Sequence, residues 1–383
     1  MSVPIRVLVV DDSAFMRHAV SKLLTADPSL VVVGTAKDGV EALEKLNRQE
    51  VDVVTLDLEM PRMDGLTTLQ QMLYRRPVPV VMVSSWTRQG ADATIRALAL
   101  GAIDFVCKPS GAGSLKMESV AEELRAKVKR AAAAGVRGRG SGQGRGAETN
   151  RPEQREWTDF RSPTAAESSE FRPRVPIRIV AIGSSTGGPK ALHEVLSRVG
   201  RDFPVPIVVV QHMPPGFTRS LAEHLDEVCP LEVREARAGD TLSAGRVFVA
   251  PGDHHLVVRR HGMIELNQEP PLHGVRPAFD VTLASLEQAY GSSCLVVLLT
   301  GMGSDGAEGA LRIRKSGGHV IAEHESTCVV YGMPRTAIEN GAADRVVPLP
   351  QIASTIEQLV CRGRIVDSGP RTSTIVSSLT GRG

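Results

Sequence analysis

Short apolar runs of strand character alternate with segments of helical spacing along the first third of the chain. The apolar runs cover residues 5–10, 31–34, 51–56, 78–83 and 103–106. Between them, residues 14–24, 39–46, 65–74 and 89–100 have apolar positions spaced as on one face of a helix. Strands joined by crossover helices lie parallel, with helices on both faces of the sheet. The alternation therefore predicts a five-stranded, doubly wound α/β domain over residues 1–129.

The same alternation returns further along the chain. Strand-like runs cover residues 177–182, 206–210, 246–250, 294–299 and 319–322, and helical patterns fill the gaps. A length of 383 residues is also too great for one ordinary core. Apolar residues make up 42% of the chain but aromatics only 3%, so aliphatic side chains must fill the interior, as in parallel sheets. We predict a second, mainly parallel α/β domain over residues 175–366, followed by a polar tail over 367–383.

The segment between the two domains, residues 130–174, has a different composition. It begins with a Gly/Arg-rich run and continues as a mixture of Glu, Ser, Pro and Arg that could bury almost nothing. Arg-Gly repeats also occur in RNA-binding segments. Acidic residues interleave from the middle onward, at Glu148, Glu153, Glu156, Asp159, Glu167 and Glu170. We therefore favour a flexible tether over an RNA-binding segment.

Charge and cysteine usage exclude several classes of protein. The net charge of +2 gives no general reason to expect nucleic acid or a membrane surface as partner. The five cysteines lack C-x-x-C spacing, which favours reduced thiols in a cytosol. Charged residues interrupt the apolar run near the N-terminus, and no apolar stretch reaches the ~20 residues that span a bilayer. We expect a cytoplasmic monomer without membrane insertion.

Polar residues follow the expected strands of the first domain. Asp11 and Asp12 come after the first strand, Asp57 after the third, Ser84 after the fourth and Lys108 after the fifth. Such sheets bind ligands at the carboxyl ends of their strands. A single Asp after a strand usually caps the next helix, but a whole set on one edge suggests a site. Clustered carboxylates suit Mg²⁺, and a facing lysine would pair with a carboxylate or with a phosphoryl group.

Four stretches of the first domain resemble the response-regulator receiver family. They are Val9-Val-Asp-Asp-Ser13, Thr55-Leu-Asp-Leu-Glu-Met-Pro-Arg-Met-Asp-Gly65, Val83-Ser-Ser85 and Cys107-Lys-Pro109. The resemblance implies that Asp57 takes a phosphoryl group from a histidine kinase. It also implies the remaining roles: Mg²⁺ held by Asp12, Asp57, Asp11 through water and the carbonyl of Glu59, Lys108 on the phosphoryl oxygens, Ser84 responding to them, and Phe105 swinging on activation.

A serine lies at a sharp turn after the first expected strand of the second domain. Gly183-Ser-Ser-Thr-Gly187 fits the G-x-S-x-G nucleophile turn, which would hold Ser185 at the carboxyl edge of the sheet. The following helix would offer free N–H groups to a developing negative charge. Three alternatives stay open: a phosphate loop with Pro189 where its lysine should be, Ser184 as the nucleophile, or an ordinary strand-to-helix turn.

Two further strands of this domain end in residues that complete a hydrolase. His212 would be the base that takes the proton of Ser185, and Asp305 would fix its tautomer and stabilise its cation. N–H groups near Thr186 and Met302 could bind the oxyanion.

Two other patterns in the second domain point elsewhere. Gly301 to Gly306 also fits the G-x-G-x-x-G of a dinucleotide site, with Glu323 near the spacing of a ribose-binding acid. That alternative leaves Ser185 and His212 unexplained. His254-His255 lacks the neighbouring acid or cysteine that a metal site needs.

The sequence of the second domain is similar to that of the chemotaxis protein-glutamate methylesterase family. The matching stretches are Ile182-Gly-Ser-Ser-Thr-Gly-Gly188, Gln211-His-Met-Pro-Pro-Gly-Phe-Thr-Arg219, Ala250-Pro-Gly-Asp253, Leu299-Thr-Gly-Met-Gly-Ser-Asp-Gly306 and Val330-Tyr-Gly-Met-Pro-Arg335. The resemblance places Ser185, His212 and Asp305 at the triad positions, with Thr186 and Met302 beside them.

This resemblance carries expectations about activity and control. It implies demethylation of glutamyl esters and deamidation of glutamines on chemoreceptors, without a cofactor for the esterase. Fusion to a receiver implies that phosphorylation of Asp57 raises the activity by relieving occlusion of Ser185. The non-enzymatic alternative is a two-domain adaptor that only binds receptors.

Overall fold

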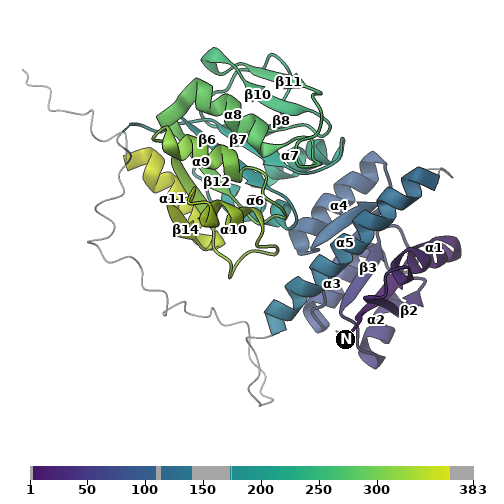
Figure 1. Cartoon of the computed structure of the whole chain (residues 1–383). Helices are drawn as coiled ribbons and strands as arrows, with labels where there is room; N and C mark the ends of the chain where they lie inside the picture. Colours follow the sequence, from purple (N-terminus) through teal and green to yellow (C-terminus); the bar gives the residue numbers. More distant parts are fainter. Residues whose placement is uncertain (1–2, 109–113, 140–172, 174, 363–383) are drawn as a thin grey trace, which may run out of the picture.

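A five-stranded parallel sheet forms the first domain of the computed structural model, which describes residues 3–108, 114–139, 173 and 175–362. The strand order is β2-β1-β3-β4-β5, and every neighbouring pair is parallel. Figure 1 shows helices on both faces of this sheet. The strands are β1 (Ile5–Val10), β2 (Leu30–Ala36), β3 (Val53–Asp57), β4 (Val80–Ser84) and β5 (Asp104–Cys107); the helices are α1 (Ala14–Thr25), α2 (Gly39–Arg48), α3 (Gly65–Arg75), α4 (Arg88–Leu100) and α5 (Ser114–Arg139). The predicted doubly wound domain is confirmed.

Local capping explains where most of these helices begin. The side chains of Ser13, Asp38, Asp64 and Thr87 each accept a hydrogen bond from a backbone N–H in the first turn of the following helix. Helix α5 continues past residue 129, where the sequence had suggested that the tether begins, to Arg139. Alanine is the strongest helix former, and Ala131 is fully buried in the core of this domain. The rest of the expected tether (140–172 and 174) and the tail lie outside the described residues.

The second domain contains a seven-stranded sheet in the order β14-β13-β12-β6-β7-β9-β8. All of its pairs are parallel, which confirms the predicted architecture. The strands are β6 (Ile179–Ser184), β7 (Ile207–Gln211), β8 (Glu232–Glu235), β9 (Arg246–Val249), β12 (Cys294–Leu298), β13 (His319–Glu323) and β14 (Arg345–Val347). The sequence does not predict the two edge strands, β8 and β14, because they are only four and three residues long and neither forms a continuous buried apolar run.

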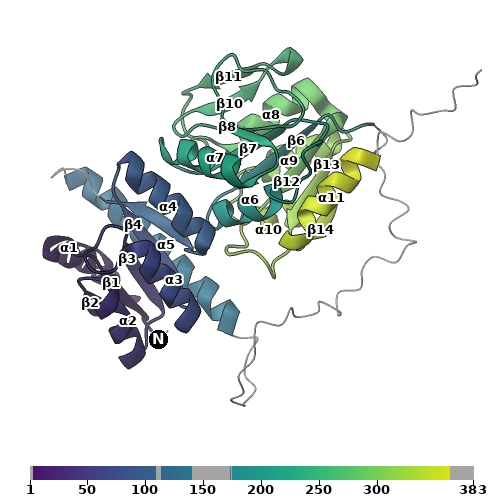
Figure 2. The same ribbon diagram turned by 180° about the vertical axis from the view of Figure 1, so that it is seen from behind.

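Helices cover both faces of this second sheet (Figure 2). One face packs against α6 (Gly188–Leu196), α7 (Phe217–Val228) and α11 (Leu349–Arg362), and the other against α8 (Phe279–Tyr290), α9 (Ala307–Lys315) and α10 (Met333–Glu339). An antiparallel ribbon of β10 (His255–Val258) and β11 (Ile264–Asn267) packs on α8. No helix within the described ranges has the length and apolar content to cross a bilayer.

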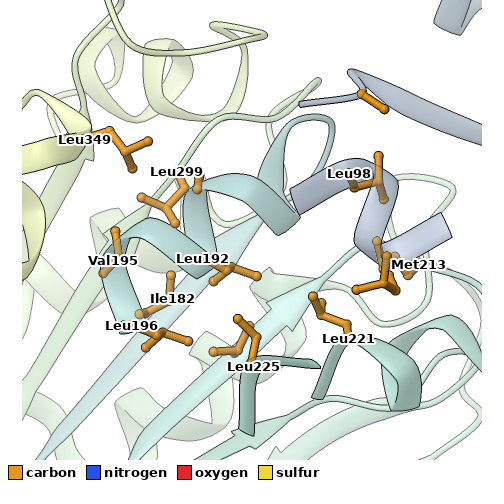
Figure 3. Close-up of a cluster of buried hydrophobic side chains, with 14 of the residues drawn as sticks. Leu98, Ile182, Leu192, Val195, Leu196, Met213, Leu221, Leu225, Leu299 and Leu349 are labelled. Atoms are coloured by element: carbon orange, nitrogen blue, oxygen red, sulfur yellow. The ribbon is translucent and has the colours of Figure 1, made fainter. Parts of the chain in front are cut away.

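The two domains meet through helix α4, which packs against α7 and α6. Leu98 of α4 belongs to the same buried apolar cluster as Met213 and Leu221 of the second domain, and Figure 3 shows the three side chains together. Leu98 is 2% exposed and Ala97 fully buried. The apolar core therefore runs without interruption from one domain into the other.

Gly183 allows the centre of the second sheet to pack closely on α8. A Cβ at this position would lie 2.1 Å from Cδ1 of Phe279, a fully buried ring. Gly183→Ala should therefore lower the free energy of unfolding by about 1–3 kcal/mol, because the ring has no free space to move into. Urea denaturation followed by circular dichroism would measure the change.

Gly200→Ala is the matched control, since a Cβ there meets only Oε1 of Glu357 at 3.4 Å. Equal stability changes in the two variants would contradict the packing argument.

Candidate active site

Ser185 follows β6 at the carboxyl edge of the second sheet, and both neighbouring strands hold its backbone. Its N–H donates to the carbonyl of Thr300 at 3.0 Å, beyond β12. Its carbonyl accepts from Nε2 of Gln211, the last residue of β7, at 2.9 Å. Gly187 caps α6 with φ of +80°, and a Cβ there would lie 2.7 Å from Val329. The turn is therefore fixed from both sides, and position 187 accommodates only glycine.

The neighbouring serine lies in a different environment. Ser184 is fully buried, and its Oγ donates to Oε1 of Gln211 at 2.6 Å. Ser185 is partly exposed. Of the two hydroxyls, only that of Ser185 can meet a substrate without rearrangement of the core.

His212 and Asp305 meet at the same edge of the sheet. His212 directly follows β7, and its Nε2 lies 2.7 Å from Oδ2 of Asp305. A carboxylate is an acceptor only, so Nε2 carries the hydrogen and Nδ1 is left as the basic nitrogen. The N–H of His212 donates to the carbonyl of Ser184 at 3.2 Å, which places the imidazole one strand away from Ser185. Among the described residues, the side chains of Ser185 and His212 share no hydrogen bond.

Asp305 is fixed by more than His212. It is 2% exposed, and its two oxygens accept from the N–H of Phe279 at 2.6 Å and of Asp280 at 2.9 Å. These two residues begin α8, where the helix dipole favours negative charge. Burial would raise the pKa of Asp305, but the His212 hydrogen bond and charge and the two backbone N–H groups outweigh it and lower the pKa. Asp305 is therefore a buried carboxylate that keeps its charge.

The two expected oxyanion positions differ in their surroundings. Met302 is 51% exposed, whereas Thr186 is 5% exposed. Within the described ranges, neither backbone N–H donates a hydrogen bond. The Thr186 hydroxyl donates to Oδ2 of Asp104 in the first domain at 2.6 Å. A residue beside Ser185 is thus bonded directly to the other domain.

The dinucleotide alternative does not fit this geometry. The loop from Gly301 to Gly306 does connect β12 to α9. Glu323, however, is fully buried, and its Oε2 accepts from the N–H of Thr300 at 2.7 Å. A ribose-binding acid must be accessible to the ligand, so Glu323 cannot serve as one.

Histidines and carboxylates elsewhere in this domain have structural bonds. His255 is fully buried and bonds the N–H of Ala278 and the carbonyl of Pro270. Ligand atoms of His273, Asp280 and Asp305 lie within 4.8 Å of one another. Asp280 accepts from His273 at 3.0 Å and from the N–H of Gly309 at 2.7 Å. These bonds hold the starts of α8 and α9 together.

The expected acidic cluster of the first domain is present. Ligand oxygens of Asp11, Asp12 and Asp57 lie within 4.8 Å of one another. Lys108 Nζ lies 2.8 Å from Oδ2 of Asp57 and 3.0 Å from Oδ2 of Asp11. Burial raises the pKa of Asp57 to about 6, Asp11 adds to the rise, and Lys108 opposes it. Three carboxylates around one point form the all-oxygen donor set that suits Mg²⁺. Glu59 follows β3 with an exposed side chain.

Ser84 connects this cluster with α4. It is fully buried and donates to the carbonyl of Gly90 at 3.1 Å, and Thr94 donates to Ser84 Oγ at 2.7 Å. Gly90 and Thr94 both belong to α4. A displacement of Ser84 would therefore be transmitted to the helix that faces the second domain.

Phe105 is buried at the interface between the domains. Its ring stacks on that of Phe217 in α7, with the two ring centroids 4.5 Å apart. Trp86 also contacts the Phe217 ring, edge-on, with a centroid distance of 6.0 Å. Sequence reasoning found Phe105 but missed Phe217, because nothing in one chain's pattern says which aromatic of one domain faces the other. It also missed Gln211 and Thr300, although a polar residue closing a buried strand is a usable signal.

Two family models match the chain. Residues 7–118 match the response regulator receiver domain, and residues 180–356 match the CheB methylesterase. These ranges agree with the two sheets described above.

Named relatives match almost the whole chain. The protein-glutamate methylesterase/protein-glutamine glutaminase of Symbiobacterium thermophilum is 55% identical over 94% of this chain and 98% of its own length. The protein of the same name from Pyrococcus horikoshii is 45% identical over 93% and 94%. The solved catalytic domain of the Thermotoga maritima CheB methylesterase is 47% identical, covers 49% of this chain and 100% of its own, and aligns with a TM-score of 0.47. The identity of the Symbiobacterium and Pyrococcus proteins to this chain across both domains shows that the chain belongs to the CheB methylesterase family, with an N-terminal response regulator receiver domain.

Proposed function

We propose that this protein is a phosphorylation-controlled serine hydrolase that demethylates glutamate methyl esters of chemoreceptors and deamidates specific receptor glutamines. The observation that carries the proposal is the hydrogen bond between His212 and the Asp305 carboxylate at 2.7 Å, one strand away from a partly exposed Ser185. The names of the relatives support the substrate class. An adaptor without activity would have no need of a buried, charge-retaining aspartate behind a histidine.

The residues perform acyl transfer in two steps. Ser185 Oγ attacks the ester carbonyl while Nδ1 of His212 takes the hydroxyl proton, and Asp305 stabilises the imidazolium that forms. The N–H groups of Thr186 and Met302 face the oxyanion, where each such donor is typically worth ~10²–10³ in rate. His212 returns the proton to the leaving methoxide, so methanol departs from an acyl-serine. Water, deprotonated by His212, then releases the glutamate.

Deamidation uses the same groups. The carboxamide of glutamine is a poorer acyl donor than a methyl ester, but its tetrahedral intermediate needs the same oxyanion donors. Protonated His212 delivers the proton that lets ammonia leave. Both reactions end in the same acyl-serine and the same product, a receptor glutamate.

Replacement of Ser185 tests the nucleophile. Ser185→Ala should reduce methanol release from methylated receptor by at least ~10³-fold, because no other hydroxyl can form the acyl intermediate. Ser184→Ala is the control. It loses a buried hydrogen bond to Gln211 but keeps the nucleophile, so it should stay measurably active. Activity retained in Ser185→Ala, or lost only in Ser184→Ala, would refute the assignment.

Asp305→Asn tests the orientation of the imidazole. The neutral amide cannot stabilise the imidazolium and can force the wrong tautomer, so kcat should fall by roughly 10²–10⁴-fold with little change in KM. Stopped assays of methanol release at several receptor concentrations would separate kcat from KM. A change confined to KM would show that Asp305 acts in receptor binding instead.

Regulation follows from the contacts between the domains. Asp11, Asp12 and Asp57 would hold Mg²⁺, which neutralises charge while Asp57 accepts a phosphoryl group from a histidine kinase. Lys108 would contact the phosphoryl oxygens, and Ser84 would turn toward them and leave its bonds to α4. The α4 helix packs on α6 and α7, next to the Ser185 turn. Loosening of this interface would expose the catalytic edge to a large helical substrate.

The interface is testable through Trp86. Trp86→Ala removes an edge-on ring contact worth ~0.5–1.5 kcal/mol, so basal esterase activity of the unphosphorylated protein should rise by roughly 2–10-fold. Tyr74→Ala is the control, since Tyr74 is 87% exposed on α3.

Acetyl phosphate with Mg²⁺ should stimulate the wild type and leave Asp57→Ala unchanged. An unchanged basal rate in Trp86→Ala would contradict occlusion by this interface. Equal stimulation of Asp57→Ala would place the phosphorylation elsewhere.

A further inference from the structure

Thr300 holds the Ser185 turn from the side of β12. It lies two residues beyond the end of this strand and is 1% exposed. Its carbonyl accepts from the N–H of Ser185 at 3.0 Å, and its Oγ1 donates to the carbonyl of Thr186 at 3.0 Å. Its Oγ1 also accepts from the N–H of Val330 at 2.9 Å. The positions of Ser185 and Thr186 therefore depend on the position of Thr300.

A buried carboxyl group anchors Thr300 in turn. In the parallel register Leu298 pairs with Ala322, so Glu323 closes the neighbouring strand β13 at the same edge. Its Oε2 accepts from the Thr300 N–H at 2.7 Å. This hydrogen bond gives the buried N–H of Thr300 the acceptor that a buried backbone donor requires.

Burial of the Glu323 carboxyl group is energetically unfavourable if the group serves only as a structural hydrogen-bond acceptor. Its side chain is fully buried, and its Oε1 has no hydrogen-bond partner among the described residues. Burial raises its pKa to about 7, and the hydrogen bond from the Thr300 N–H opposes the rise. A large fraction of the Glu323 carboxyl groups is therefore protonated and neutral near pH 7. Glutamine closely resembles this neutral form in size and shape.

We infer that Glu323 is a positioning residue for the hydrolysis, holding Thr300 so that Thr300 fixes the Ser185 nucleophile and the adjoining Thr186 N–H. The inference rests on the proposed function. Glu323 touches no substrate and takes no proton from it. Its contribution is geometric, because a displacement of about 1 Å in a catalytic turn can cost ~10²-fold in rate.

Two variants of the full chain separate this role from simple stabilisation. Glu323→Gln keeps an oxygen acceptor for the Thr300 N–H, so kcat for methanol release should stay within about threefold of wild type. Glu323→Leu removes the acceptor, and kcat should fall by roughly 10–100-fold with KM within about twofold. Glu357→Leu is the matched control. It loses a glutamate bond to the N–H of Gly200, far along the chain from Ser185, and should keep its kcat.

Thermal unfolding across pH checks the burial of Glu323 independently of activity. A folded pKa near 7 against an ordinary value of 4.5 means that wild type loses stability as pH rises from about 4.5 to about 7. Glu323→Gln lacks this loss. The melting temperature of the Gln variant relative to wild type should therefore be higher at pH 8 than at pH 5, while kcat stays close to that of wild type.

The outcomes distinguish the inference from the proposed function. A fluorophosphonate probe that labels activated serines would report on Ser185 directly. Wild type that neither releases methanol nor reacts with the probe would overturn the proposed function. Active wild type with unchanged kcat in folded Glu323→Leu would overturn the positioning role, as would a Gln variant as impaired as the Leu variant. If Glu323→Leu does not fold, Glu323→Met replaces it: lost kcat with unchanged KM supports the role, and unchanged kcat overturns it.

Discussion

The catalytic edge of this protein depends on one buried carboxylate. Asp305 accepts from His212 and from two backbone N–H groups at the start of α8, so a single side chain joins three segments that are distant in sequence. A buried charge is tolerated only when its lone pairs are satisfied, and here every bond that satisfies it also places a part of the site. The loop after β12, the end of β7 and the first turn of α8 are consequently fixed relative to one another. The orientation of the imidazole follows from the electrostatic requirement of the aspartate.

The backbone of the nucleophile turn is also fixed by hydrogen bonds from neighbouring segments. Gln211 from one side and Thr300 from the other take up the carbonyl and the N–H of Ser185, so the turn cannot relax without breaking bonds to both neighbouring strands. The first domain reaches this turn as well, through the bond from Thr186 to Asp104 and the stacked rings of Phe105 and Phe217. Contacts of this kind are individually worth about 0.5–1.5 kcal/mol, which is the range in which a phosphoryl group can shift an equilibrium between two domain arrangements.

The sequence reading succeeded where one residue's chemistry and its place at a strand end were sufficient evidence. It placed Ser185, His212 and Asp305 on one edge, and it gathered Asp11, Asp12, Asp57 and Lys108 on another. It was less successful with residues whose role lies in what they touch. Glu323 was considered as a ribose-binding acid because its spacing fits, yet the fold turns its carboxyl inward onto Thr300. Ser184 and Ser185 carry the same hydroxyl group, but Ser184 is buried at the end of β6, whereas Ser185, just beyond the strand, is partly exposed.

By itself, the sequence determined two parallel α/β domains, because the period of its apolar residues and the turn chemistry between them allow little else. It also determined the inventory of reactive groups at the strand ends, since parallel strands must present their carboxyl ends together. The tertiary structure alone decided which nitrogen of His212 faces Asp305, which serine is accessible, and that α4 packs on α6 and α7. These depend on side-chain direction and on packing between segments far apart in the chain. Local propensity carries no information about such contacts, because their energy arises only when both partners are already in place.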